Sequence, residues 1–163
     1  MSIDLKQLFE VVGDVRPLDE TLDLSDYELF GTKPFVTPIQ IQGKIENKAG
    51  VVVLNADVRF VLRVNCDRCL DEFERAFDYP VEHVLVTELN TDNDEYIVVE
   101  NHLLDLDELI LSDILLNLPS KLLCSEDCKG LCSMCGQNFN KGSCDCNDKL
   151  VDPRFAVLDE LLK

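Results

Sequence analysis

Eight cysteines fall as four close pairs in this 163-residue chain, and their spacing constrains the fold more than any other feature. The pairs are Cys66/Cys69, Cys124/Cys128, Cys132/Cys135 and Cys144/Cys146. Tetrahedral zinc takes four thiolates at about 2.3 Å, and a pair separated by one to four residues supplies two of them from a single tight turn. We therefore expect two zinc ions, each held by four cysteines. Spacing alone leaves an iron–sulfur cluster or a disulfide framework as alternatives.

The N-terminal sequence bears on the state of these thiols. It reads Met-Ser-Ile-Asp-Leu-Lys-Gln, without the basic and then apolar regions of a secretory signal. No stretch approaches the eighteen or so apolar residues of a membrane helix. We therefore expect a cytoplasmic protein without a membrane partner, in which the cysteines are reduced and available to metal.

Four pairs can form two sites in three ways, and loop closure favours one of them. Only eight residues separate Cys135 from Cys144, so the last two pairs are expected to share a metal. The predicted sites are Cys66, Cys69, Cys124 and Cys128 for the first metal, and Cys132, Cys135, Cys144 and Cys146 for the second. The first metal would then hold together two segments that are far apart in the sequence. Pairing Cys124/Cys128 with Cys132/Cys135 stays open, although it crowds the ligands.

The hydrophobic pattern predicts an α+β fold, with an antiparallel β-sheet or partly open barrel, a covering helix and a Cys-rich zinc-binding tail. Leu5, Leu8, Phe9 and Val12 have helical spacing, and we expect Gly13 and Pro17 to end that helix. From Val36 the period changes to two, and Asn-Lys-Ala-Gly at 47–50 supplies a hairpin turn.

The second strand of this hairpin alternates from Leu54 to Asn65, and Phe73–Thr87 reads as the next strand. The Cys66/Cys69 pair therefore lies at a strand connection. A short strand is expected at 96–100, and a helix that an Asp105/Glu108 capping box opens, that runs through Leu118 and that Pro119 ends. We predict a core at 1–118 and a tail at 119–163 that ends in a helix begun by Asp152 and Pro153.

Charge is strongly negative and unevenly placed. The formal net charge is −17, which opposes contact with nucleic acid backbones. Residues 76–120 contain eleven acidic residues and no lysine or arginine, so this face is either a solvated surface or a site for a basic partner. Four arginines form the one local positive patch and are candidates to face RNA or a partner: Arg59, Arg63, Arg68 and Arg75.

No catalytic residues are predicted. Sites with four cysteines have no open position for water and are typical of structural zinc. His83 and His102 lie outside any metal-ligand spacing, and no nucleophile motif or phosphate-binding loop is present. We therefore expect a protein that is not an enzyme.

Four segments around the cysteines form a specific pattern: Cys66-Asp-Arg-Cys69-Leu70, Leu123 to Asn140 with its Gly-Leu-Cys-x-x-Cys-Gly motif, Cys144-Asp-Cys146, and Asp152-Pro153-Arg154-Phe155. They closely resemble the bacterial YceD family, described as large ribosomal RNA subunit accumulation proteins. It implies a non-enzymatic ribosome-biogenesis factor in a bacterial cytoplasm, which supports accumulation and maturation of 23S ribosomal RNA and assembly of the 50S subunit.

The implied role in RNA maturation and the negative charge point in different directions. Either the four arginines and the near-neutral tail form a local RNA-facing edge, or the acidic face binds a basic ribosomal protein or RNA-processing factor and the effect on RNA is indirect. We favour the second interpretation. The alternative function is a zinc-thiolate redox-switched chaperone, in which oxidation of the second site releases zinc and unfolds the tail.

Overall fold

The computed structural model describes residues 1–29, 31–88 and 96–146. It contains two compact units. The first comprises residues Met1–Val64 and Glu72–Leu122, and the second comprises Asn65–Asp71 together with the chain from Leu123 onward. No helix in the described parts of the chain combines the length and apolar character that crossing a membrane requires. The expected C-terminal helix lies outside the described residues.

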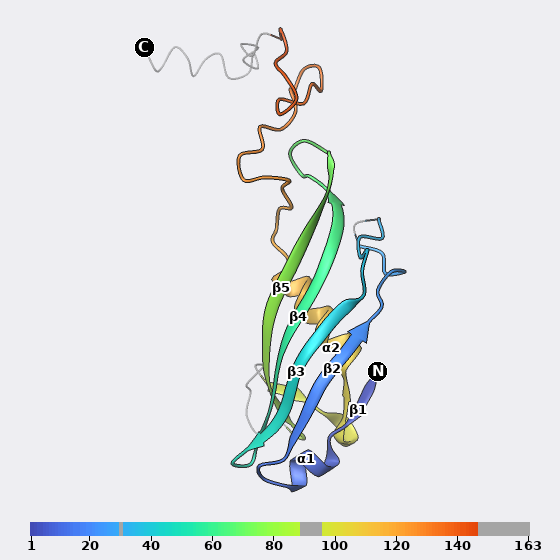
Figure 1. Ribbon diagram of the computed structural model, residues 1–163, viewed down its shortest axis with the longest axis vertical. Helices are drawn as coiled ribbons and strands as arrows, with labels where there is room; N and C mark the ends of the chain where they lie inside the picture. The colour runs from blue at the N-terminus through green and yellow to red at the C-terminus, as the bar shows by residue number, and fades with distance from the viewer. Residues whose placement is uncertain (30, 89–95, 147–163) are drawn as a thin grey trace, which may run out of the picture. The chain divides into compact units, whose positions relative to one another are not determined.

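The first unit is built on a curled, half-barrel sheet of five strands in the order β2-β3-β4-β5-β6 (Figure 1). Their bounds are β2 Val15–Leu22, β3 Ile39–Lys48, β4 Val51–Asn65, β5 Glu72–Val86 and β6 Tyr96–Val98. The β2–β3 and β3–β4 pairs are antiparallel, and β6 runs parallel to the end of β5. The predicted hairpin, its long second strand and the short strand near residue 96 are confirmed.

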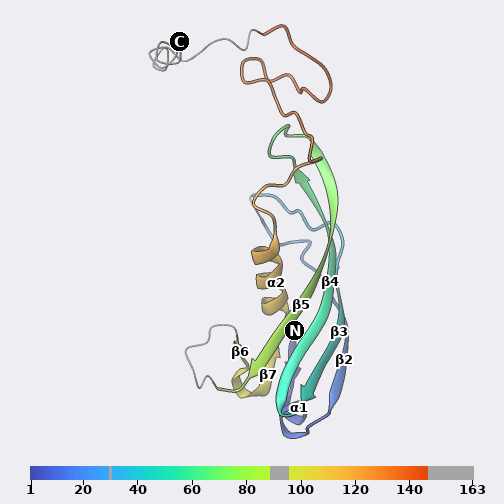
Figure 2. The same ribbon diagram turned by 90° about the vertical axis from the view of Figure 1, so that its left-hand side faces the viewer.

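Helix α2, Leu106–Asn117, covers one face of this sheet (Figure 2). Asp105 caps it by accepting hydrogen bonds from the backbone N–H groups of Asp107 and Glu108, as the sequence predicted. Beside it lies a small antiparallel pair, β1 (Ser2–Asp4) and β7 (Leu103–Asp105), preceded by a 3₁₀ turn at Glu100–His102. The buried helix residues, Leu106, Ile110 and Ile114, supply its side of the core.

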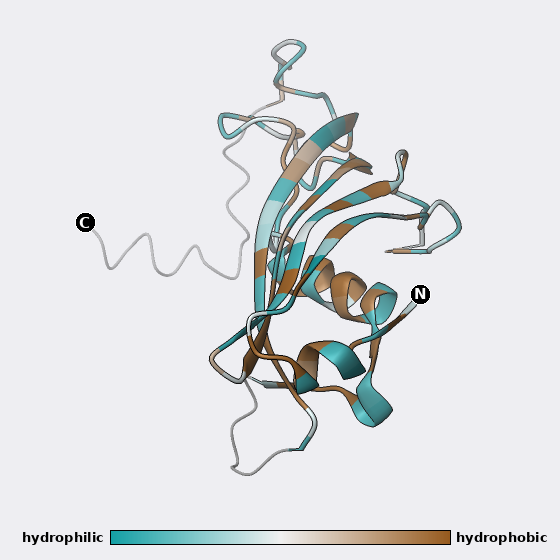
Figure 3. Ribbon diagram, turned by 60° about the horizontal axis from the view of Figure 1, so that its bottom comes forward, coloured by the Kyte–Doolittle hydropathy of each residue, from teal (hydrophilic) through white to brown (hydrophobic). Residues whose placement is uncertain are grey.

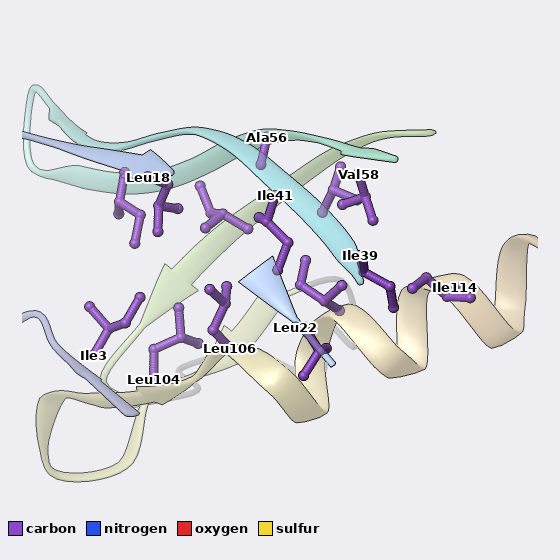
Figure 4. Packing of buried hydrophobic residues seen from close by; sticks show 14 of the residues in the cluster. Ile3, Leu18, Leu22, Ile39, Ile41, Ala56, Val58, Leu104, Leu106 and Ile114 are labelled. Carbon is purple, nitrogen blue, oxygen red and sulfur yellow. The ribbon is translucent and has the colours of Figure 1, made fainter. Parts of the chain in front are cut away.

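Alternation along the strands places the core between the sheet and this helical layer. In β4 the even-numbered residues from Val52 to Leu62 are buried, and the intervening ones face solvent or are half-buried. Figure 3 shows this alternation as bands of apolar and polar colour along the strands. Ile39, Ile41 and Val58 point toward the side of the sheet on which Leu106 and Ile114 lie (Figure 4). Together these side chains form one continuous apolar cluster.

The N-terminal segment differs from the prediction. Helix α1 spans only Lys6–Glu10, and Val12 is 66% exposed, so the apolar stripe ends at Phe9. The chain then turns at Gly13 and forms β2, a strand that we did not expect because it contains Pro17. As β2 is an edge strand, Pro17 can lack its N–H without removing an interior hydrogen bond of the sheet.

Candidate metal centres

The first cysteine group combines two segments that are far apart in the sequence. It consists of Cys66, Cys69, Cys124 and Cys128, whose sulfur atoms all lie within 4.8 Å of one another. The Sγ atoms of Cys66 and Cys128 are 3.8 Å apart, and those of Cys69 and Cys124 are 3.7 Å apart. A tetrahedral ion with metal–sulfur bonds of 2.3 Å requires sulfur–sulfur edges of about 3.8 Å, whereas a disulfide requires about 2.05 Å. The geometry therefore fits a four-thiolate metal ion.

The second group lies within one short stretch of the tail. It consists of Cys132, Cys135, Cys144 and Cys146, again with all four sulfur atoms within 4.8 Å of one another. These are the two groups that loop closure favoured in the sequence. Both can hold a metal ion, and four-sulfur tetrahedral sites in proteins take zinc or iron. Among the residues that the structure describes, no other cluster of His, Cys, Asp or Glu has this property.

Each group contains one tight turn of the same construction. The Leu70 N–H donates to the Cys66 carbonyl at 2.9 Å, and the Gly136 N–H donates to the Cys132 carbonyl at 2.9 Å. The residue after the second cysteine has a positive φ in both turns, 61° at Leu70 and 75° at Gly136. Glycine is the usual residue in this conformation, so Leu70 is the unusual member of the pair.

These turns direct backbone N–H groups at the first cysteine of each pair. Burial opposes ionisation of Cys66, but hydrogen bonds from backbone N–H groups, those of Arg68 and Cys69 among them, lower its pKa to about 6. The N–H groups of Cys135 and Met134 likewise lower the pKa of Cys132 to about 7. Each group therefore contains one thiol that readily supplies the thiolate a metal requires.

One further thiol in each group, Cys124 in the first and Cys146 in the second, resists ionisation without a positive ion nearby. Desolvation, followed by interaction with the other three thiols, raises the pKa of Cys124 to about 12. In the second group, the hydrogen bond with Cys135 and then burial raise the pKa of Cys146 to about 12. Four negative sulfurs at these separations repel one another strongly, and a divalent cation removes that repulsion.

Polar side chains that the sequence analysis missed connect the first turn to the tail. Asp71 accepts hydrogen bonds from Asn138 Nδ2 at 2.9 Å and from Lys141 Nζ at 2.8 Å, and its carbonyl accepts from the Cys66 N–H. Asn140 Nδ2 donates to the sulfur of Cys128 at 3.2 Å and lowers the pKa of that thiol. The Asn-x-Asn sequence after Gly136 was the available signal for these contacts.

Arg68 belongs to the second unit and contacts the loop that carries Cys128. Its Nη1 donates to the carbonyl of Cys128 at 3.0 Å. Gly130 has a φ of 75°, and a Cβ there would lie 3.1 Å from the Arg68 carbonyl, so the backbone segments approach closely. Arg68 thus fixes the loop that carries Cys128.

The other candidate arginines are engaged on or beside the long strands. Arg59 Nε donates to Asp78 Oδ2 at 3.0 Å, and Arg63 Nη2 donates to Glu74 Oε1 at 2.6 Å. The guanidinium of Arg75 lies 5.6 Å from the centre of the Phe77 ring. Arg59 and Arg63 therefore do not present unneutralised positive charge on the sheet.

The two histidines belong to the first unit, while all eight cysteines belong to the second. His83 Nε2 lies 2.9 Å from Asp113 Oδ2 and links β5 to α2. The His102 ring packs edge-on against Phe9 with centroids 5.6 Å apart. Asp113 is thus one of the acidic residues at 76–120 with a partner in the fold, and Asp92, Asp94 and Glu95 lie outside the described residues.

Comparison with known proteins identifies the family. The family model described as "Large ribosomal RNA subunit accumulation protein YceD" matches residues 54–162, which include every cysteine. This chain belongs to the YceD family. The match begins within β4, so it contains the long β4–β5 hairpin, α2 and both cysteine groups.

Similar proteins occur in bacteria and plants. The Bacillus subtilis protein YlbN is 25% identical over 100% of this chain and 97% of its own length. A chloroplastic Arabidopsis thaliana protein, "Large ribosomal RNA subunit accumulation protein YCED homolog 1", is 27% identical over 86% of this chain and 52% of its own length. The Mycobacterium leprae protein ML1660 is 26% identical over 77% and 59%, respectively. The chain thus spans nearly all of the first relative but little more than half of the other two. No solved structure matches.

Proposed function

We propose that this protein is a non-enzymatic ribosome-biogenesis factor that supports accumulation and maturation of 23S ribosomal RNA and assembly of the 50S subunit in the bacterial cytoplasm. The observation that carries this proposal is membership of the YceD family, whose description names accumulation of the large ribosomal RNA subunit. The plant relative has the same words in its name.

The proposed cofactors are two zinc ions, one in each cysteine group. The sulfur–sulfur distances of 3.7 and 3.8 Å in the first group support a tetrahedral ion of this size. Bound zinc would neutralise four converging thiolates and cross-link the turns that carry them. The cysteines of such closed sites hold the backbone in place and leave no position for a reacting molecule, which supports a role outside catalysis.

We further propose that the acidic surface binds a basic ribosomal protein or RNA-processing factor, through which the chain affects RNA. The ion pairs of Arg59 and Arg63 with carboxylates support this mode over direct contact with RNA, because RNA phosphates would have to displace those carboxylates. The net charge of −17 supports it as well, since it repels RNA and attracts basic proteins at long range.

Depletion of the protein in its bacterial host tests the role in the large subunit. We expect 23S ribosomal RNA and 50S particles to fall relative to 16S ribosomal RNA and 30S particles, as measured on sucrose gradients and by primer extension. Unchanged 50S levels after full depletion would contradict the proposed function.

Affinity capture from the same host, with and without ribonuclease and at two salt concentrations, tests the mode of binding. We expect capture of a basic protein that resists ribonuclease and weakens with salt. A triple variant, Glu88→Gln, Glu100→Gln and Glu108→Gln, should reduce it without removing an ion pair of the described fold. The control, Glu10→Gln, Glu28→Gln and Glu126→Gln, removes the same charge outside residues 76–120. Capture that ribonuclease abolishes would favour direct RNA contact instead.

A further inference from the structure

Strand β5 has a long outer edge, most of which is not paired with any described part of the first unit. It spans Glu72–Val86, fifteen residues, and it is hydrogen-bonded to β4 along one side. On the other side β6 pairs only with Val84–Val86. Within the described part of the first unit, no residue outside the sheet makes a backbone hydrogen bond to Glu72–Glu82. Figures 1 and 2 show β5 at the margin of the sheet beyond β4.

The position of Val86 identifies the residues whose backbone groups face outward. The Val86 carbonyl accepts a hydrogen bond at 2.8 Å from Val99, which follows β6, so it points to the outer edge. The N–H and C=O groups of successive strand residues point to alternate edges. The outward residues of β5 are therefore the even-numbered ones. The side chains alternate between the two faces of the sheet: those of Phe77, Val81 and Leu85 enter the core, and the even-numbered ones from 72 to 82 are exposed on the other face.

Proline occurs at one of these outward positions. Pro80 has no N–H, and at an outward position it removes no hydrogen bond to β4. The continuous stretch of unpaired donors and acceptors is therefore Glu72 to Asp78, with Glu74 and Ala76 between them. A strand edge of this kind is a template for another extended chain.

Three carboxylates lie on the exposed face of this stretch, two of them paired with arginines of β4, while Arg75 of β5 lies over the Phe77 ring. Arg63 donates through both Nε and Nη2 to Oε1 of Glu74, and Arg59 donates to Oδ2 of Asp78. These contacts leave Glu74 Oε2 and Asp78 Oδ1 without a hydrogen bond to the described residues. Glu72 adds a further exposed carboxylate at the same edge. On the opposite face of the strand, Phe73 and Tyr79 are only half-buried.

We propose that the outer edge of β5, from Glu72 to Asp78, binds an extended basic segment of a protein partner as an added β-strand. This inference rests on the proposed function, because it takes the partner to be basic and adds a strand-pairing contact at β5 to the attraction by the carboxylates at 76–120. Backbone hydrogen bonds to Glu74, Ala76 and Asp78 hold the segment. The added strand lies about 4.8 Å from β5, so lysine or arginine side chains on one face pair with the carboxylates and apolar side chains on the other contact Phe73 and Tyr79.

Charge favours a basic polypeptide over two other possible occupants of this edge, a second copy of the chain and RNA. A second copy of the chain would place Glu72, Glu74 and Asp78 beside the same carboxylates of its partner, and like charges on adjacent strands are destabilising. RNA phosphates would meet the same repulsion and offer no donors and acceptors in strand register. A basic polypeptide satisfies both the backbone groups and the carboxylates.

Binding of an eight-residue peptide of alternating lysine and valine to the full-length, metal-loaded protein tests the proposal. The variant Ala76→Pro removes an outward N–H but no hydrogen bond to β4, and Ala76→Val is the matched control that keeps it. A second peptide carries methyl groups on the backbone nitrogens that would face β5. It keeps the charge but cannot donate backbone hydrogen bonds to the strand. We expect Ala76→Pro and N-methylation each to weaken binding by about tenfold, and Ala76→Val to bind within about twofold of the original chain.

Hydrogen exchange measured by NMR locates the peptide. We expect the amides of Glu74, Ala76 and Asp78 to become protected when the peptide binds. The proposal is overturned if the N-methylated peptide binds the original chain equally well, if protection arises elsewhere, or if these amides are protected by self-association or by a single-stranded RNA instead. The N-methylated peptide keeps the test valid even if Ala76→Pro does not fold.

Complementation of the depleted host separates this proposal from the proposed function. We expect Ala76→Val to restore 23S ribosomal RNA and Ala76→Pro to fail at equal protein levels. If depletion has no effect on ribosomal RNA, the proposed function is wrong, and the peptide experiments still decide whether the edge binds a strand. If both variants restore ribosomal RNA equally, the edge proposal is wrong and the function stands.

Discussion

Leu70 and Gly136 occupy the same position in the turns of the two candidate metal centres, although one has a large apolar side chain and the other has none. Both have a positive φ, which costs a non-glycine residue roughly 1–2 kcal/mol relative to glycine. Leu70 is also 65% exposed, so burial of its side chain does not compensate for that cost. Backbone strain of this kind persists only where the surrounding structure fixes it, here the turn that carries Cys66 and Cys69.

Exchanging these two residues should change metal affinity in opposite directions. We expect Leu70→Gly to stabilise the first turn by about 0.5–1 kcal/mol, after allowing for the greater backbone entropy of glycine. Gly136→Leu should weaken the second turn by about 1 kcal/mol. Competition with a chromophoric chelator measures both. Weaker metal binding in Leu70→Gly would contradict this account.

Gly43 illustrates a second use of glycine, at a point where two adjacent strands of the curled sheet leave no room for a side chain. It pairs with Ala56 across β3 and β4, and a Cβ at Gly43 would lie 2.1 Å from the Asn55 carbonyl oxygen and 2.5 Å from the Ala56 Cα. Both atoms belong to the backbone, so no side-chain rotation relieves the overlap.

We therefore expect Gly43→Ala to destabilise the first unit by about 2–4 kcal/mol, because the strands must separate. Urea denaturation followed by circular dichroism measures this loss. Gly142→Ala is the control, since the nearest atom to its added Cβ is a glutamine side-chain nitrogen at 3.7 Å, an ordinary contact. A loss below about 0.5 kcal/mol in Gly43→Ala would show that the sheet adapts at little cost.

At the scale of elements, the sequence predicted best where one physical signal dominates. The alternation of β4 and the Asp105 cap of α2 were predictable because each depends on neighbouring residues and on one buried face. β2 was not, since Pro17 normally argues against a strand and only its place at the sheet edge, a tertiary property, permits it. The β1–β7 pair was also missed because it joins three-residue segments about a hundred residues apart.

The grouping of cysteines followed from loop length, but the contacts that support it did not. Asp71 bonds to Asn138 and Lys141 across nearly seventy residues, and no local pattern specifies such partners. Prediction of the arginine contacts from the sequence was limited in the same way. The clustering of the arginines was visible in the sequence, but which carboxylates neutralise Arg59 and Arg63 depends on the pairing of β4 with β5.

The two cysteine groups differ in what they connect, and single substitutions should reveal it. The first joins Asn65–Asp71 to the tail, and the second lies within fifteen residues of it. We expect Cys66→Ser and Cys144→Ser each to retain one metal ion in native mass spectrometry. Hydrogen exchange should increase at both 65–71 and 123–131 in Cys66→Ser, and mainly at 132–146 in Cys144→Ser. Identical exchange patterns in the two variants would contradict separate sites.

At the scale of the whole molecule, the two units are stabilised in different ways. All residues of the continuous apolar cluster, from Ile3 to Leu122, belong to the first unit. The described part of the second unit contributes none to that cluster, and its buried residues include four of the cysteines. A small segment without an apolar core depends on metal for its structure.

Removal of metal should therefore unfold the second unit and leave the first intact. We expect a strong chelator under reducing conditions to abolish protection from hydrogen exchange at 123–146, while amides in β3 and β4 keep theirs, because some 10–16 kcal/mol of apparent binding energy per structural zinc is withdrawn only where the ion binds. Re-addition of zinc to the same sample is the control and should restore protection. Simultaneous loss of protection in β4 would mean that the apolar cluster alone does not keep the first unit folded. The metal in the first cysteine group would then stabilise the sheet as well as the tail.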